Sequence, residues 1–289
     1  MKDFYPALKK DALLRNLPVL QTTLAFPGRA AGKGIRADLL GNLSSYADYG
    51  NSHNYFSFGE NPSDRIKDDH LPLNSRITPG KPMMSTEGGY QMGDGDGYKG
   101  TWEDGLSAPF SEDVHGRYLL RYVLEQYRLG YRRSFIYELL DSDAAQWGLF
   151  RADISPRPAA RGLGSMIKLL SEGRWDDSAK RWAVPSFTPR ALLFTLPNLP
   201  ERVHTLLLEK SDGRFYLVLW NEVNNWDVST GKPVYSRSVP LTLRIGQSVK
   251  QVRTFLPLTH VTSVTATFNS SVVKLEVPDH PLIVEIDPK

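Results

Sequence analysis

The first 171 residues alternate between two patterns of apolar and polar side chains. Helical spacing of the apolar positions, at three and four residues, occurs in four segments: 1–16, 37–45, 111–130 and 158–171. Strand-like apolar runs lie between them: Leu17–Leu24, Asp48–Tyr55, Lys81–Gly88 and Phe135–Asp141. Because strands separated by helices pair in parallel through crossover connections, this half of the chain is predicted to be an α/β structure with four parallel strands. Residues 56–76 and the Gly- and Asp-rich segment 91–109 are predicted to be loops.

The pattern changes near residue 185, where short strands begin to follow one another without helices. Eight are predicted: Ala191–Phe194, Thr205–Glu209, Phe215–Trp220, Leu241–Ile245, Val252–Phe255, Ser263–Thr267, Val272–Val277 and Leu282–Ile286. Turn residues separate them, for example Asp212-Gly213. Regularly spaced short strands are typical of an all-β module, and a β-sandwich is the architecture we expect.

The segment Lys81–Gly89 carries the chemistry of greatest interest. Pro82 can open a strand but cannot lie in its middle, so the strand is expected to run on to Glu87. Strict alternation would place Met83, Ser85 and Glu87 on one face and Met84 and Thr86 on the other. The glycines that follow leave space beside the carboxylate. Such a glutamate can be catalytic, or it can cap a loop or pair with an arginine.

Composition narrows the possible functions. The chain has 289 residues, of which 40% are hydrophobic and 23% charged, with a net charge of +3 and no basic block, so nucleic acid is not an expected partner. No run of about 18 apolar residues is present, so no membrane-spanning segment is expected. There is no cysteine, which excludes disulfides and thiolate metal sites.

Two further motifs have competing interpretations. The loop Asp94-Gly95-Asp96-Gly97 suggests calcium, but its spacing does not fit an EF-hand and turn chemistry explains it, so neither a metal nor a cofactor is expected. Trp220-Asn221-Glu222 ends an apolar run with an Asn-Glu pair, which could be catalytic. It lies among the short strands of the second half, where a strand-end turn accounts for it.

The order of motifs resembles the C-terminal half of a clan A glycoside hydrolase, a retaining enzyme with a (β/α)8 barrel of the TIM type. The residues that carry the resemblance are Ser52-His53-Asn54-Tyr55, Thr86-Glu87-Gly88 and Tyr137-Glu138-Leu139, followed by Pro156-Arg157-Pro158-Ala159. By this resemblance Leu17–Leu24, Asp48–Tyr55, Lys81–Gly88 and Phe135–Asp141 are barrel strands five to eight. Residues 1–172 then form a half barrel, and residues 173–289 a linker and an accessory β-sandwich.

The resemblance implies roles for individual residues. Glu87 would be the nucleophile, and His53 and Tyr55 would bind sugar hydroxyls or position Glu87. Trp102 and Trp147 are candidate sugar platforms, and Glu138 could line the cleft. Each also has a structural alternative: a buried histidine, core aromatics, and a glutamate paired with Arg132 or Arg133.

The resemblance also implies a missing part. The acid/base glutamate of this family ends the fourth strand, which would precede residue 1, and a complete barrel takes about 250 residues. The sequence therefore predicts a retaining glycosidase that lacks its acid/base strand, with a carbohydrate as substrate and a possible homo-oligomer that completes the barrel. The alternative is a non-catalytic carbohydrate-binding or self-assembling module.

Overall fold

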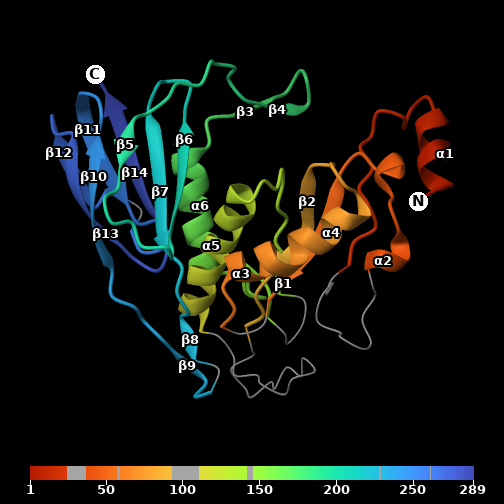
Figure 1. The fold of residues 1–289 in the computed structure, drawn as a ribbon, viewed down its shortest axis with the longest axis horizontal. Helices are drawn as coiled ribbons and strands as arrows, with labels where there is room; N and C mark the ends of the chain where they lie inside the picture. The colour runs from red at the N-terminus through yellow and green to blue at the C-terminus, as the bar shows by residue number, and fades with distance from the viewer. Residues whose placement is uncertain (25–36, 57–58, 93–110, 142–145, 228, 261) are drawn as a thin grey trace. The chain divides into compact units, whose positions relative to one another are not determined.

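The computed structural model describes residues 1–24, 37–56, 59–92, 111–141, 146–227, 229–260 and 262–289 (Figure 1). These residues form two compact units. Unit 1 takes its described residues from Met1–Phe110, Tyr122–Ile154 and Val228–Gly231, and unit 2 takes them from Ser111–Arg121, Ser155–Asp227 and Lys232–Lys289. Within the described part of the chain, none of the helices has both the length and the apolar character needed to cross a membrane.

Unit 1 contains several short helical segments. They are α1 (Phe4–Lys10), α2 (Ala37–Leu40), the 3₁₀ turn η1 (Ser44–Tyr46), α3 (Pro62–Arg65), the π-helical turn η2 (Ile66–His70) and α4 (Leu71–Ile77). The helix expected over 1–16 ends at Lys10, since Asp11 is already extended. The loop expected over 56–76 is wrong for most of its length, because Pro62 starts a helical run that buries Ile66 and Ile77 completely.

Four segments of unit 1 pair in parallel and in chain order, as predicted. Strands β1 (Gly50–Tyr55) and β2 (Met83–Gly89) form a parallel pair. On one side Leu20 forms a parallel bridge with Tyr49, and on the other Ser85 bridges Ser134. The outer two segments are thus joined to the central pair by isolated bridges rather than by full strands.

The last of these segments departs from expectation. Residues Phe135–Asp141 are not the buried strand that the apolar run predicts. Phe135 is 51% exposed and Leu139 66% exposed, and Leu140 forms only an isolated bridge with Phe150. A short apolar run does not by itself show whether the segment is a buried strand. In this structure Phe135, Leu139 and Leu140 of the run are exposed to solvent.

Helix α5 (Glu112–Arg128) follows its sequence signals closely. The Ser111 Oγ accepts a hydrogen bond from the Val114 amide at 3.3 Å, and Gly130 has a φ of +93° just past the end of the helix. The helix contributes to both units, with residues up to Arg121 in unit 2 and residues from Tyr122 in unit 1. Helix α6 (Pro158–Leu170), which belongs to unit 2, starts at Pro158 as predicted.

Unit 2 is rich in antiparallel strands. They are β3 (Arg174–Asp176), β4 (Arg181–Ala183), β5 (Phe194–Thr195), β6 (Val203–Glu209), β7 (Phe215–Asn221), β8 (Trp226–Asp227), β9 (Lys232–Pro233), β10 (Val239–Ile245), β11 (Val249–Phe255), β12 (Thr265–Phe268), β13 (Val272–Val277) and β14 (Leu282–Pro288). One sheet has the order β13-β10-β5, and a second has β12-β11-β14-β7-β6. Alternate residues of both sheets meet in a single core, with Leu217, Leu243, Leu275 and Val284 almost completely buried. The chain is thus a mixed α/β structure with many strands and few helices, as the pattern predicts in outline.

We expect Gly88→Ala to destabilise unit 1. A Cβ at this position would meet the Tyr122 Oη and come within 2.6 Å of the Asn54 carbonyl oxygen. Overpacking of this kind costs about 1–3 kcal/mol, which chemical denaturation followed by circular dichroism would measure. The matched control is Gly164→Ala in α6, where no atom lies within 4 Å of the new Cβ, and where alanine should stabilise the helix by up to about 1 kcal/mol. Equal unfolding midpoints for Gly88→Ala and wild type would contradict this prediction.

Candidate active site

A β-bulge in β2 determines which face of the strand Glu87 occupies. Ser52 of β1 is opposite Ser85, but the next residue, His53, is opposite Glu87, so Thr86 is an extra residue in β2. The Ser85 hydroxyl lies against the Tyr122 hydroxyl of α5, at 3.2 Å. Without the extra residue Glu87 would share that face. The strict alternation expected from the sequence is therefore wrong here, and Glu87 faces His53 and Tyr55 instead.

The Glu87 carboxylate is held by two side chains of β1. The Tyr55 hydroxyl donates a hydrogen bond to Oε2 at 2.6 Å, which is the short distance typical of a hydroxyl bound to an ionised carboxylate. His53 Nδ1 lies 3.3 Å from the same oxygen. The Glu87 side chain remains 41% exposed. Burial, together with this carboxylate, raises the pKa of Tyr55 well above its ordinary value, so the phenol stays protonated as a donor.

His53 connects Glu87 to a second pair of polar side chains. Its Nε2 lies 3.1 Å from the Thr86 Oγ1. The Thr86 hydroxyl and amide both donate to the Asn51 Oδ1, at 2.9 and 3.2 Å. Burial lowers the pKa of His53 and outweighs the opposing effect of the Glu87 charge. The neutral imidazole is therefore favoured, and both ring nitrogens are within hydrogen-bonding range of an oxygen.

Aromatic rings surround Tyr55. The ring centroid of Trp147 lies 5.1 Å from that of Tyr55, and Tyr137 lies 6.2 Å away, both edge-on. Trp147 is only 8% exposed, so it packs behind the tyrosine. The Glu138 amide donates to the Trp147 carbonyl at 3.3 Å, which places Glu138 beside this aromatic group through its backbone.

The structure thus brings four of the six predicted site residues together: Glu87, His53, Tyr55 and Trp147. Trp102 and the loop Asp94–Gly97 lie outside the described residues. Three neighbours had no predicted role: Asn51, Thr86 and Tyr137. Thr86 and Tyr137 belong to the quoted motifs and Asn51 directly precedes one of them, but the contact between Asn51 and Thr86 depends on the bulge, which the sequence does not signal.

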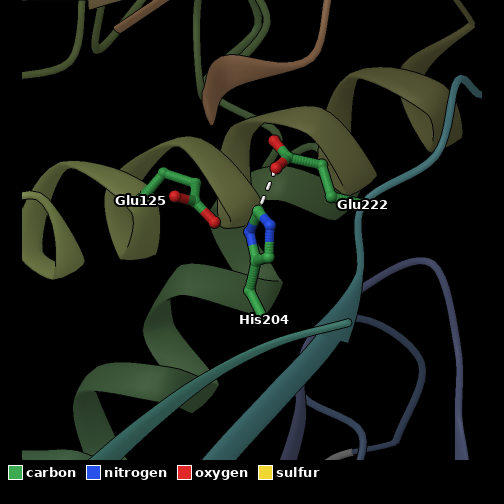
Figure 2. Close-up of side chains that lie close together, drawn as sticks. All are labelled: Glu125, His204 and Glu222. Atoms are coloured by element: carbon green, nitrogen blue, oxygen red, sulfur yellow. Dashed lines mark ion pairs between the residues drawn. The ribbon is translucent and has the colours of Figure 1, made fainter. Parts of the chain in front are cut away.

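Glu222, the competing Asn-Glu glutamate, is completely buried in unit 2. Its Oε2 lies 3.1 Å from Nδ1 of His204, as Figure 2 shows. Glu125, drawn in the same figure, pairs with Arg128 of its own helix. A fully buried glutamate with a histidine partner fits the structural interpretation of this motif.

A groove of about 630 Å³ follows the parallel segments of unit 1. All four segments line it, through Pro18 and Leu20, Tyr49, Met84 and Thr86, and Phe135. The lining is mainly apolar, with Pro82 and two arginines, Arg132 and Arg133, completing it. Thr86 lines the groove and also contacts His53, so the groove and the Glu87 site lie on the same face of β2.

Comparison with known proteins finds similarity in structure only. No family model and no curated protein sequence matches the chain. A solved glucosidase from Croceicoccus marinus superposes with a TM-score of 0.58 at 11% identity, and the match covers 99% of this chain and 63% of that one. A GH51 arabinofuranosidase from Xanthomonas axonopodis pv. citri matches at TM-score 0.47 and 11% identity, over 84% of this chain and 54% of that one. The catalytic domain of GH30 xylanase C from Talaromyces cellulolyticus gives 0.46 and 14%, over 85% and 46%.

At these identities the comparison shows the fold alone. The TM-score of the glucosidase is high enough to carry weight, and it shows that this chain shares the fold of the matched part of that glucosidase. The chain spans less than two thirds of the length of that glucosidase.

We expect the His53 imidazole to titrate below about 6.5, the ordinary histidine value. Glu87→Gln should lower the pKa of His53 further, because it removes the charge that favours the imidazolium. Because the pKa of His53 is lower in the folded state than in the unfolded state, the unfolded state binds more protons as the pH falls. The contribution of His53 to the free energy of unfolding is therefore complete above about pH 6.5 and is lost as the pH falls through the folded-state pKa. Nitrogen NMR of labelled histidine would measure both pKa values, with Glu60→Gln as the control. A pKa of His53 that rises in Glu87→Gln would refute this account of the site.

Proposed function

We propose that this chain carries the nucleophile half of a retaining glycoside hydrolase of the clan A kind. The observation that supports this most directly is the placement of Glu87. It is an accessible carboxylate at the end of a parallel strand, held through one oxygen by Tyr55 and His53 of the adjacent strand. Retaining glycosidases use a carboxylate so placed to attack the anomeric carbon of a sugar.

The proposed chemistry assigns a task to each group. The Glu87 carboxylate forms an ester bond to the anomeric carbon while the bond to the leaving oxygen breaks. The hydrogen bond from Tyr55 orients the carboxylate through Oε2, which leaves Oε1 for attack. A second carboxyl group gives a proton to the leaving oxygen, and it later activates the water that hydrolyses the ester. We propose that this proton donor lies outside the four parallel segments, as the motif order implies.

The proposal extends to the architecture. The four parallel segments in chain order fit strands five to eight of a (β/α)8 barrel, and the two sheets around one core fit an accessory β-sandwich. The solved glucosidase contains more than a third of its chain outside the match, enough for further barrel strands. O-glycosidic carbohydrates are the substrate class that such a site would accept.

We further propose that the groove becomes part of the interior of a closed barrel, and that a second copy supplies the remaining strands when this chain is alone. Its apolar lining has the character of a barrel interior, and two sets of four parallel segments make eight, the number in a closed barrel of this type. Exposed strand edges and apolar faces favour such pairing.

Glu87→Gln should abolish hydrolysis of an aryl glycoside with a good leaving group, by at least about 10⁴-fold, the scale of nucleophile removal in other enzymes. An aryl substrate is chosen because loss of general acid catalysis costs other substrates about 10²–10⁴-fold. A 2-fluoro glycoside should add its sugar mass at Glu87, as read by peptide mass spectrometry. The control is Glu276→Gln, an exposed glutamate of β13. Turnover that persists in Glu87→Gln would favour the non-catalytic alternative.

Light scattering should show a dimer of this chain, and Phe135→Asp should convert it to a monomer. Phe135 is 51% exposed and lines the groove, so a charge there opposes burial against a second copy. Phe268→Asp is the matched control, because Phe268 is 64% exposed on β12 of unit 2. A monomeric wild type, or a dimer that survives Phe135→Asp, would overturn self-assembly without touching the role of Glu87.

A further inference from the structure

A short hairpin of unit 2 presents two tryptophans to solvent. Strands β3 and β4 pair antiparallel, with Trp175 directly opposite Trp182. Directly opposite residues project from the same face of a hairpin, about 5 Å apart at Cβ. Trp175 is 53% exposed and Trp182 56% exposed. In Figure 1 the hairpin projects away from the two larger sheets of its unit.

Each indole is held in place despite this exposure. The Trp175 Nε1 donates a hydrogen bond to the Asp177 Oδ1 at 3.1 Å. Trp182 lies over the backbone of Gly173, where a Cβ would meet its Nε1 and come within 2.6 Å of its Cδ1. Gly173 therefore leaves the space in which one side of the indole rests. The other side of the Trp182 indole is the side exposed to solvent.

The hairpin itself is fixed by its turn. The Asp176 Oδ1 accepts hydrogen bonds from the amides of Ser178 and Ala179, both at 3.0 Å. These hydrogen bonds stabilise the turn that connects β3 to β4. The two rings are therefore already ordered in the free protein, so less conformational entropy is lost when a ligand binds to them.

We propose that Trp175 and Trp182 form a binding platform for a β-linked glycan, at a site separate from the chemistry of Glu87. Pyranose rings with equatorial hydroxyls present faces of C–H groups, and these faces pack on the flat surface of an indole. The exposed turn residues Asp177 and Lys180 offer polar groups next to the pair that suit the hydroxyls at the ring edges, whereas alternation places Arg174 and Arg181 on the opposite face of the hairpin. Fixed aromatic surface bordered by polar groups is the combination that a sugar chain requires, whereas a purely apolar partner would leave these groups unpaired.

The platform is tested on the full chain carrying Glu87→Gln, so that a sugar is bound without being cleaved. Cellohexaose, xylohexaose and laminarihexaose are the probes, and isothermal titration calorimetry and tryptophan fluorescence are the measurements. We expect at least one probe to bind and to shift the emission to shorter wavelength. The double variant Trp175→Ala/Trp182→Ala should weaken binding at least about tenfold. Phe268→Ala, at a comparably exposed aromatic residue of β12, should leave binding unchanged.

Two further variants test the platform without removing a ring. Gly173→Ala should displace the indole of Trp182 and weaken binding several-fold. Asp177→Asn, which can still accept the Trp175 hydrogen bond, should bind as the parent does, whereas Asp177→Ala should bind more weakly. The proposal is overturned if none of the three probes binds, or if the double variant binds as tightly as its parent. If the parent self-associates but binds no sugar, and the double variant no longer self-associates, the two tryptophans form a contact between proteins instead. None of these outcomes bears on whether Glu87 is the nucleophile.

Discussion

The candidate site depends on one extra residue in β2. Because Thr86 has no partner in β1, the side chains of Ser85 and Glu87 project from opposite faces of the strand. Ser85 then meets the tyrosine hydroxyl of α5, while Glu87 meets His53 and Tyr55. The same residue that causes the bulge contributes its hydroxyl and its amide to Asn51 on the neighbouring strand. The irregularity is therefore anchored on both sides of the strand.

The side chains that contact the Glu87 carboxylate are neutral. Tyr55 remains a neutral phenol because burial and the adjacent carboxylate raise its pKa, and burial lowers the pKa of His53. The neutral Tyr55 phenol orients the anion by hydrogen bonding and leaves its formal charge in place. A permanent cation at this distance would lower the energy of the resting carboxylate much more strongly. Neutral partners thus suit a nucleophile better than an ion pair would.

The sequence predicts the regular parts of this fold well and the irregular parts poorly. Strand β13 occupies Val272–Val277 as expected, since alternation and flanking turns are local signals. The helices between Pro62 and Ile77 were missed because Lys67, Asp68 and Asp69 interrupt the apolar spacing. Glu87, His53 and Tyr55 could be grouped from motif order. The bulge that brings them together could not, because it arises between β1, which ends at Tyr55, and β2, which begins only at Met83, and it has no local signature.

Helix α5 limits how the chain can be divided. Its first half supplies Arg117, which pairs with Asp279, and Tyr118, whose hydroxyl accepts a hydrogen bond from the Asn225 amide at 2.9 Å. Its second half supplies Tyr122, which lies against Ser85. An excised β-rich fragment that began at Ser155 would leave Asp279, 2% exposed, without its guanidinium partner. Recombination that exchanged the β-rich part between proteins would therefore have to carry the first half of α5 with it, so the strands do not behave as an interchangeable appendage.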